Sequence, residues 1–455
     1  MKNLRTFTIA ALSILSAASL TAAGNGGKRA EWIFSKSKNP KAAIDFVESG
    51  RYCSQAGEPS EISFVRAKRS ADPAKKLSHK NGMPIAENTA AGDYWLFEMP
   101  VEHLDAGTAV DFWAMFFSSP CDTPHKFMFE YCDGGKWIPV YEQKKEDGIK
   151  YNCLSTTSDK HPRRLWRSVR LSKPVDNDAV RFRIRQSDKA VLSTTLGGST
   201  TGQSPKIICY DTSVPRDTLK MLFLGNSYTY YNEYPVIFKE IAWREGHYAD
   251  CDIFVSGGYT MKAHLANKVS RETVEKGGYD YAFLQDQSFN AVLIGTEDDK
   301  GVVENMSKMT DRIRKYSPDA KTVIEITWGR KFGSNNLGKK YEYLPTKYPS
   351  YFSDYNAMQN RLTDMITEEA RITGSQVSPV GIAWQIVRRE RPDIELYGKD
   401  AHHPSYAGSY LSAVVAYLTV YRTPFGNNPI NGKLDASTAA YLRDAAQRAV
   451  LKGEK

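Results

Sequence analysis

The feature that most constrains the fold is a change in the pattern of apolar residues near residue 215. Before it, short runs rich in β-branched and aromatic residues alternate with clusters of glycine, proline, aspartate and serine. After it, short apolar runs alternate with longer segments whose apolar residues recur with the period of a helix. The chain therefore divides into two domains, which we place at 24–216 and 217–455.

The pattern before residue 217 is typical of antiparallel strands. Residues 180–185 alternate strictly between apolar and charged side chains, which indicates a strand with one buried face. Asp133-Gly134-Gly135 between two such runs predicts a hairpin turn. Residues 193–204, rich in serine, threonine and glycine, predict a loop. We expect an antiparallel β-sandwich, jelly-roll-like, as an accessory domain. The expected strands are 61–67, 93–98, 109–117, 126–132, 136–141 and 179–185.

The pattern after residue 217 predicts an α/β domain. Alternation of short strands with helices produces a parallel sheet covered by helices, so a doubly wound fold is expected. The expected strands are 219–224, 251–255, 281–284, 322–327 and 376–380. The expected helices are 235–245, 302–316, 351–373, 406–420 and 436–451.

Composition and charge exclude several classes of protein. With 41% hydrophobic and 25% charged residues, the chain is globular and not disordered. The net charge is +9, but basic residues are interleaved with acidic ones, as in residues 388–393. This mixture predicts a solvated surface, and we expect no nucleic-acid partner.

Residues 1–23 resemble a signal peptide. Lys2 and Arg5 precede an apolar run at 6–20, and Thr21-Ala22-Ala23 supplies the small residues of a cleavage site. No later segment is apolar enough to cross a bilayer, so no membrane anchor is expected. The predicted location is the periplasm or the extracellular space.

The chain has six cysteines. An exported protein meets an oxidising compartment, so disulfides are one interpretation and small buried side chains are the other. The spacing leaves the connectivity open and does not fit a zinc site. The cysteines are Cys53, Cys121, Cys132, Cys153, Cys209 and Cys251.

Two short motifs carry the chemistry. Gly225-Asn226-Ser227 follows the first parallel strand, and functional groups of such sheets lie at the carboxyl ends of strands. Asp400 and His403 lie in one loop before a predicted helix, in the sequence Asp-Ala-His-His-Pro. A serine hydroxyl needs a base to take its proton, and a carboxylate can fix the tautomer of the histidine that does so. Adjacent histidines usually diverge, so we expect His403 to face the serine and no metal to bind.

Together these motifs resemble the SGNH or GDSL-like hydrolase superfamily, over roughly residues 218–452. That superfamily carries its serine in a Gly-Asp/Asn-Ser motif and its aspartate and histidine in an Asp-x-x-His-Pro motif. The resemblance implies a flavodoxin-like three-layer α/β/α fold. It also implies Ser227, Asp400 and His403 as the catalytic residues, with no cofactor and no metal.

The resemblance also implies an oxyanion hole. Its second block is a glycine after strand two, which here is Gly257 or Gly258, and the backbone N–H of Ser227 would join it. The third block, Gly-x-Asn, is missing, so the third donor stays open among Gln285, Gln287 and Asn290.

Other side chains are weaker candidates. Tyr228 and Trp328 could contact a sugar, although core packing explains aromatic residues equally well. Arg330 could bind a carboxylate of the substrate or pair with a neighbouring acid. His264 lies in a stretch that resembles a Bacteroidetes-type branch of the superfamily, and a hydrogen-bonded helix histidine is the alternative.

We predict a secreted serine esterase that removes acetyl groups from a polysaccharide or oligosaccharide. One alternative is a lipid or acyl esterase with the same mechanism. The other is a catalytically weak glycan-binding protein, because the third block is altered.

Overall fold

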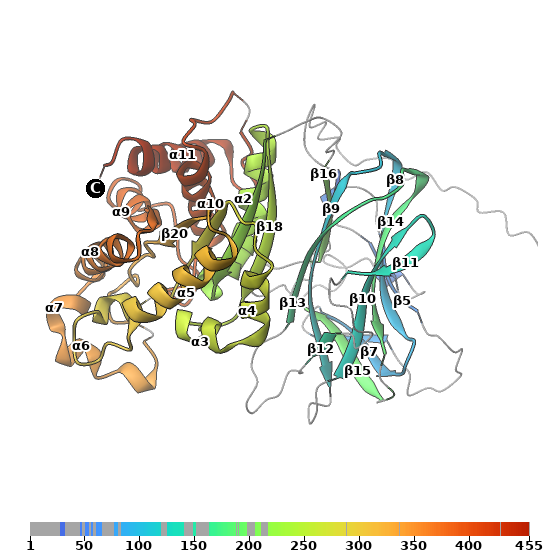
Figure 1. Cartoon of the computed structure of the whole chain (residues 1–455), viewed down its shortest axis with the longest axis horizontal. Coiled ribbons are helices and arrows are strands. Elements are labelled where there is room, and N and C mark those ends of the chain that lie inside the picture. Colours follow the sequence, from blue (N-terminus) through green and yellow to red (C-terminus); the bar gives the residue numbers. More distant parts are fainter. Residues whose placement is uncertain are drawn as a thin grey trace, which may run out of the picture.

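The structure is a computed structural model, and most of the chain is described in it. The described residues form two regions (Figure 1). The antiparallel region comprises strands β1 to β16, and the parallel region comprises residues 217–454. The predicted signal peptide at 1–23 lies outside the described residues. The described residues are 28–31, 46–47, 51–53, 56–57, 61–65, 77–80, 83–119, 125–140, 149–151, 163–187, 189, 191–197, 205–210, 217–287, 289–335, 337–427 and 429–454.

The strands of the antiparallel region form two sheets of eight strands each. One sheet has the order β4-β1-β16-β9-β15-β7-β6, with β13 also paired to β9, and the other β11-β10-β14-β8-β5-β3-β2, with β12 paired to β10. The strands are β1 Lys28–Glu31, β2 Phe46–Val47, β3 Arg51–Cys53, β4 Ala56–Gly57, β5 Glu61–Val65, β6 Leu77–Lys80, β7 Met83–Thr89, β8 Tyr94–Leu104, β9 Ala109–Ser119, β10 His125–Asp133, β11 Lys136–Pro139, β12 Ile149–Tyr151, β13 Arg163–Arg170, β14 Val175–Gln186, β15 Leu192–Gly197 and β16 Lys206–Tyr210.

The two sheets share one hydrophobic core. Alternate residues of β8 and β14 point inward, because side chains of a strand alternate between its faces. Phe112 of β9 stacks on Phe182 of β14 with ring centroids 4.8 Å apart, which joins the sheets. The predicted hairpin is confirmed: Asp133 pairs with Lys136 across a turn at Gly134 and Gly135, both with positive φ.

The parallel region is a mixed α/β unit built on a five-stranded sheet, with the order β18-β17-β19-β20-β21. All neighbouring strands are parallel, and this order is that of flavodoxin-like sheets. The strands are β17 Asp217–Gly225, β18 His247–Val255, β19 Tyr281–Leu284, β20 Lys321–Glu325 and β21 Gln376–Ser378. The helices are α1 Ser227–Tyr230, η3 Tyr231–Glu233, α2 Tyr234–Arg244, α3 Met261–Ala266, α4 Lys268–Glu275, η4 Asn290–Leu293, α5 Val302–Tyr316, η5 Lys339–Tyr341, α6 Leu344–Lys347, α7 Pro349–Phe352, α8 Tyr355–Thr373, α9 Val380–Glu390, α10 Tyr406–Tyr421 and α11 Ala436–Leu451.

Strand β17 shows why the sheet is covered on both faces. Met221 and Phe223 pack with residues of α2, α9, α10 and α11. Leu222 and Leu224 point to the opposite face and pack with α3, α4, α5 and α8. A strand buried on both faces is continuously apolar, as this one is in sequence.

The two regions meet along a seam between β9, β13 and β16 on one side and α2 and β18 on the other. Figure 1 shows β18 as the part of the parallel sheet nearest the antiparallel sheets. Aromatic rings fill the seam: Trp113, Trp166, Tyr210, Trp243 and Tyr248 are all buried. Strand β9 is packed on both faces, so it contributes side chains both to the core of the antiparallel region and to the seam.

Most of the expected elements of the parallel region are present with small changes of boundary. Helices α5 and α11 begin and end where the sequence predicts. The loop predicted at 193–204 is wrong in its first part, because β15 pairs there with β7 and β9. The strand predicted at 376–380 is shorter, since α9 begins at Val380, and the sequence did not predict α9.

Cysteine side chains are described at three positions. Cys132 and Cys251 carry free thiols, and Cys209 is buried in the core of the antiparallel region. The side chains of the other three lie outside the described part of the chain. Among the helices that the structure describes, none is both long enough and apolar enough to cross a membrane.

Candidate active site

The turn after β17 presents Ser227. A Cβ at Gly225 would collide with the Thr229 hydroxyl, so only glycine fits at the strand end. Asn226 is the N-cap of α1, and its side-chain oxygen accepts from Tyr228 N at 3.1 Å. Its Nδ2 donates to Tyr259 O at 2.9 Å. Ser227 is thus the partly exposed first residue of a helix, and its own N–H has no partner within that helix.

Gln285 holds this turn from the end of the neighbouring strand β19. Its Oε1 accepts from Asn226 N at 3.0 Å and from Thr229 Oγ1 at 2.9 Å. The side chain is 3% exposed. Its Nε2 donates to the backbone oxygen of Asp286. Both ends of the Gln285 amide are therefore engaged within the protein, and Gln287 and Asn290 remain as the partly exposed amides beyond the strand end.

The turn after β18 lies beside Ser227. Ser256 N donates to Gly225 O at 3.3 Å, because β17 and β18 are paired up to their last residues. Gly257 and Gly258 form the turn, and Gly258 has a φ of 68°. Among the described residues, no group accepts a hydrogen bond from the N–H of either glycine. These N–H groups are thus available to a ligand.

Asp400 and His403 form a tight pair in the loop before α10. Asp400 Oδ2 lies 2.6 Å from His403 Nδ1. Asp400 Oδ1 accepts from the backbone N–H groups of His402 and His403, at 3.2 and 3.0 Å. A carboxylate at Nδ1 favours the tautomer with the proton on that nitrogen, which leaves Nε2 as an acceptor and base.

The surroundings shift the pKa values of this pair. Burial raises the pKa of Asp400, but the hydrogen bonds from His403 and from the backbone N–H groups outweigh it and bring the pKa to about 2. Burial lowers the pKa of His403, and the nearby Arg330 guanidinium lowers it further, whereas Asp400 raises it. The net shift is downward, so His403 is a neutral base at neutral pH.

The serine turn and the histidine loop converge at one edge of the sheet. Tyr231 stacks on His403 with ring centroids 4.1 Å apart and an angle of 2°, and Tyr228 meets the same imidazole edge-on at 5.8 Å. Asn232 Nδ2 donates to Pro404 O at 3.1 Å and to Ser409 Oγ at 3.0 Å. Segments far apart in sequence therefore hold one imidazole between them.

Asn232 was not predicted as part of the site. Its φ is 51° and that of the next residue, Glu233, is 59°, so two successive residues adopt the left-handed conformation. Asparagine tolerates this conformation better than most residues, and that was the one available signal in the sequence. The pattern could not show that its side chain reaches the histidine loop.

The expectation that His402 and His403 diverge is wrong. Their ring centroids are 4.0 Å apart, and with Asp400 they place three potential ligand atoms within 4.8 Å of one another. Burial lowers the pKa of His402 to about 4, and His403 and Arg330 also lower it. The same positive charge of Arg330 opposes a metal cation at this position.

The aromatic candidates are packing residues in this structure. Tyr228 and Trp328 are 2% and 0% exposed and stack on each other with centroids 4.4 Å apart. Trp328 Nε1 donates to His402 O at 3.0 Å, which anchors the histidine loop. Arg330 is 4% exposed and lies 5.5 Å from the Phe289 ring centroid. Their burial leaves no open ring face for a sugar.

His264 is a hydrogen-bonded helix histidine beneath the serine turn. Its Nδ1 lies 3.0 Å from Ser270 Oγ and its Nε2 3.1 Å from Gly225 O. The side chain is fully buried, and burial lowers its pKa to about 4. It therefore supports Gly225 and does not face the site.

Comparisons with known proteins give structural likeness alone. No family model and no curated protein matches the chain. A DUF4886 family protein from Bacteroides uniformis matches with 17% identity and a TM-score of 0.41, over 52% of this chain and 97% of that one. A family two carbohydrate esterase from Clostridium thermocellum, solved with cellohexaose, matches with 14% identity and a TM-score of 0.30, over 79% and 98%.

A third match is described as a GDSL-like lipase from Parabacteroides merdae. It has 10% identity and a TM-score of 0.33, over 45% of this chain and 95% of that one. The chain is similar to SGNH/GDSL-like hydrolases. With TM-scores below 0.5, the likeness to SGNH/GDSL-like hydrolases does not carry the functional argument, which rests on Ser227 and the groups around it.

Proposed function

We propose that the chain is an exported serine esterase that removes acetyl groups from a polysaccharide or oligosaccharide. The observation that carries the proposal is the 2.6 Å contact between Asp400 Oδ2 and His403 Nδ1, on an imidazole packed against the helix that begins at Ser227. Export rests on the signal-like residues 1–23, and the saccharide rests on the resemblance alone.

The proposed reaction has two steps. Nε2 of His403 takes the proton of Ser227 as its Oγ attacks the ester carbonyl, and Asp400 stabilises the imidazolium. Collapse of the tetrahedral intermediate expels the alcohol, which receives that proton, and leaves an acetyl-serine. Water, deprotonated by the same imidazole, then releases acetate and restores Ser227.

The developing oxyanion needs donors about 2.7–3.1 Å away. The N–H groups of Ser227 and of Gly257 or Gly258 are suited to this, because they follow neighbouring strand ends and no described residue accepts a hydrogen bond from them. A side-chain amide of Gln287 or Asn290 is proposed as the third donor. No metal or other cofactor takes part in this scheme.

We propose the same division of the chain as in the sequence: a β-sandwich accessory domain at 24–216 and a hydrolase domain at 217–455. The shared core of the two antiparallel sheets supports the first, and the strand order of the parallel sheet supports the second.

The test is hydrolysis of p-nitrophenyl acetate and octanoate by the full chain. Acetate preference supports the proposal, octanoate preference would make the chain an acyl or lipid esterase, and no turnover would leave a glycan-binding protein. Ser227→Ala should lower kcat by about 10⁴–10⁶ and abolish labelling by a fluorophosphonate. Ser437→Ala, an exposed serine at the start of α11, is the control that should keep both.

A further inference from the structure

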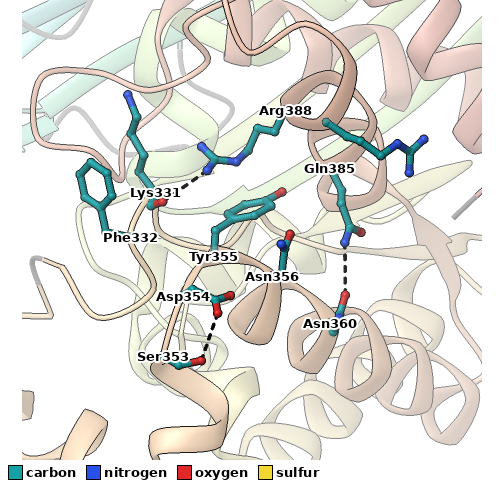
Figure 2. Close-up of a pocket in the computed structure, with 10 residues that line it drawn as sticks. Lys331, Phe332, Ser353, Asp354, Tyr355, Asn356, Asn360, Gln385 and Arg388 are labelled. Carbon is teal, nitrogen blue, oxygen red and sulfur yellow. Dashed lines mark hydrogen bonds between the residues drawn. The ribbon is translucent and has the colours of Figure 1, made fainter.

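A cavity of about 840 Å³ lies beside the site, between the loop after β20 and helices α8 and α9 (Figure 2). Lys331 and Phe332 line it from the loop, Tyr355 and Asn356 from the start of α8, and Arg388 from α9. Its lining combines aromatic rings with cationic and amide side chains. None of these residues has a part in the reaction proposed above.

The Arg388 guanidinium lines this cavity, and its charge interacts with that of Glu395 at a distance longer than an ion pair. In Figure 2 the Arg388 side chain lies beside the Tyr355 ring. Its guanidinium is 4.0 Å from the Tyr355 ring centroid and 5.2 Å from that of Tyr397. Its Nη2 donates to Lys331 O at 3.4 Å. Among the described residues, Arg388 forms no ion pair, and its Nε is buried without a hydrogen-bond partner. The next residue, Arg389, by contrast, pairs with acids.

The acids nearest to Arg388 are engaged by other groups. Asp354 caps α8, since its Oδ1 accepts from Ala357 N at 2.9 Å. Glu395 pairs with Lys331 Nζ at 2.5 Å and also accepts from Tyr397 N at 3.0 Å. The positive charge of a guanidinium that packs on aromatic rings without an ion pair is poorly compensated. Its planar N–H groups can donate two parallel hydrogen bonds to one carboxylate.

The remaining lining suits a sugar ring. Phe332 is 62% exposed, which is rare for a ring this large, and it offers an apolar face. Asn356, Asn360 and Gln385 supply amide groups that both donate and accept, as sugar hydroxyls require. The Tyr355 hydroxyl is buried, and no described residue forms a hydrogen bond with it.

The wall of the cavity also supports the histidine loop. Lys331 N donates to Ala401 O at 3.1 Å, and Asn335 Nδ2 donates to the same oxygen at 3.2 Å. Tyr397, under the Arg388 guanidinium, donates from its hydroxyl to Gly329 O at 2.7 Å. One short loop thus joins the cavity to the loop of His403, and a chain-like substrate could reach both.

We propose that this cavity binds a uronic acid unit of the saccharide substrate, with its carboxylate on Arg388 and its ring against Phe332. The proposal rests on the proposed function for the saccharide, and it adds that the saccharide is acidic. It assigns the cavity to a sugar beyond the one that carries the ester.

The experiment is calorimetric titration of the full chain carrying Ser227→Ala, which binds without turnover. Glucuronate and galacturonate are compared with glucose and galactose, and with acetate as a carboxylate without a ring. At least one uronate should bind about tenfold tighter than its neutral sugar and than acetate. Arg388→Met should remove that preference, and Arg391→Met, at the end of α9 where the arginine pairs with Asp393 and does not line the cavity, should keep it.

A second variant guards against misfolding of Arg388→Met. Asn356 is exposed in the first turn of α8, where aspartate is well tolerated, so Asn356→Asp should fold and repel the carboxylate. Equal binding of uronate and neutral sugar, or binding of acetate as tight as that of uronate, would overturn the proposal. Hydrolysis of p-nitrophenyl acetate is measured separately, so an active chain without uronate preference refutes only this cavity, and an inactive chain that prefers uronate refutes only the esterase.

Discussion

The seam and the candidate active site each contain a close pair of titratable side chains, but the two pairs differ in exposure to water. In the seam, Lys239 and Asp111 are 0% and 1% exposed and lie 2.8 Å apart, and Lys206 and Glu233 form a second buried pair. In the active site, Asp400 is 39% exposed and His403 16%. The seam thus encloses matched opposite charges, whereas the active site leaves its pair open to solvent.

The pKa values follow the same division. Burial lowers the pKa of Lys239, but the Asp111 carboxylate outweighs it and the pKa lies above its usual range. That lysine stays charged at any ordinary pH. Burial lowers the pKa of His403, the Asp400 carboxylate raises it and the Arg330 guanidinium lowers it, with a net downward shift, so this side chain is the neutral member of its pair at neutral pH. The buried Lys239–Asp111 ion pair thus indicates a structural role, and the partly exposed Asp400–His403 pair indicates a functional one.

The two regions are nevertheless connected through one segment. Glu233, paired with Lys206 of β16, follows directly after Asn232 and Tyr231, which contact the histidine loop. The seam therefore anchors the segment that packs on His403. Substitutions made separately in the seam and in the active site should show whether each charged residue contributes to stability or to catalysis.

The largest effect is expected at His403. His403→Ala removes the base and should lower kcat for p-nitrophenyl acetate by about 10⁴–10⁶ without unfolding the protein. His402→Ala should keep most of the turnover, because the side chain of His402 does not hold the Asp400 carboxylate at hydrogen-bond distance. Circular dichroism of both variants is the control for folding. The reverse result would assign the base to His402 and remove the role of Asp400.

The next effect is on stability and lies in the seam. Asp111→Ala leaves the Lys239 ammonium buried without its carboxylate and should lower the free energy of unfolding by about 3–5 kcal/mol. Urea denaturation measures it. Lys239→Met added to Asp111→Ala should recover most of the loss, since the double variant leaves no unpaired charge at this position. Asp178→Ala, at an exposed pair with Arg181, is the matched control and should cost less than about 1 kcal/mol.

A somewhat smaller effect is expected at the third oxyanion donor. Asn290→Ala, at one of the two proposed donors, should lower kcat by about 10²–10³, equivalent to about 2.7–4 kcal/mol, with little change in KM. Gln287→Ala is measured in parallel, and one of the two should show the effect. If neither lowers kcat beyond about threefold, backbone N–H groups alone hold the oxyanion.

The smallest effect is expected in the pH profile. Since the base must be neutral and the pKa of His403 is lowered, kcat/KM should fall only below the pH at which free imidazole titrates, about 6.5. Arg330→Gln removes a cation that lowers this pKa, so the acid limb should move to higher pH by less than about one unit. A limb that moves to lower pH, or not at all, would show that Arg330 does not act on His403 through its charge.

The sequence by itself determined the order of the main strands of the parallel sheet and the two motifs. The continuous apolar run of β17 predicts a strand buried on both faces, and the glycine before Asn226 predicts the turn that presents Ser227. The spacing of Asp400 and His403 predicts a contact within one loop, which the structure has. These features depend on neighbours in sequence, so local periodicity and spacing are enough to find them.

Only the tertiary structure decided which distant side chains meet. Gln285 after β19 supports Asn226 after the neighbouring strand β17, Lys239 pairs with Asp111 from another region, and Glu395 forms its ion pair with Lys331. Even the orientation of His402 depends on packing beyond its own loop. No local pattern specifies these contacts, because they arise where segments far apart in the chain are brought together, and burial there sets both the partners and the pKa values of the charged groups.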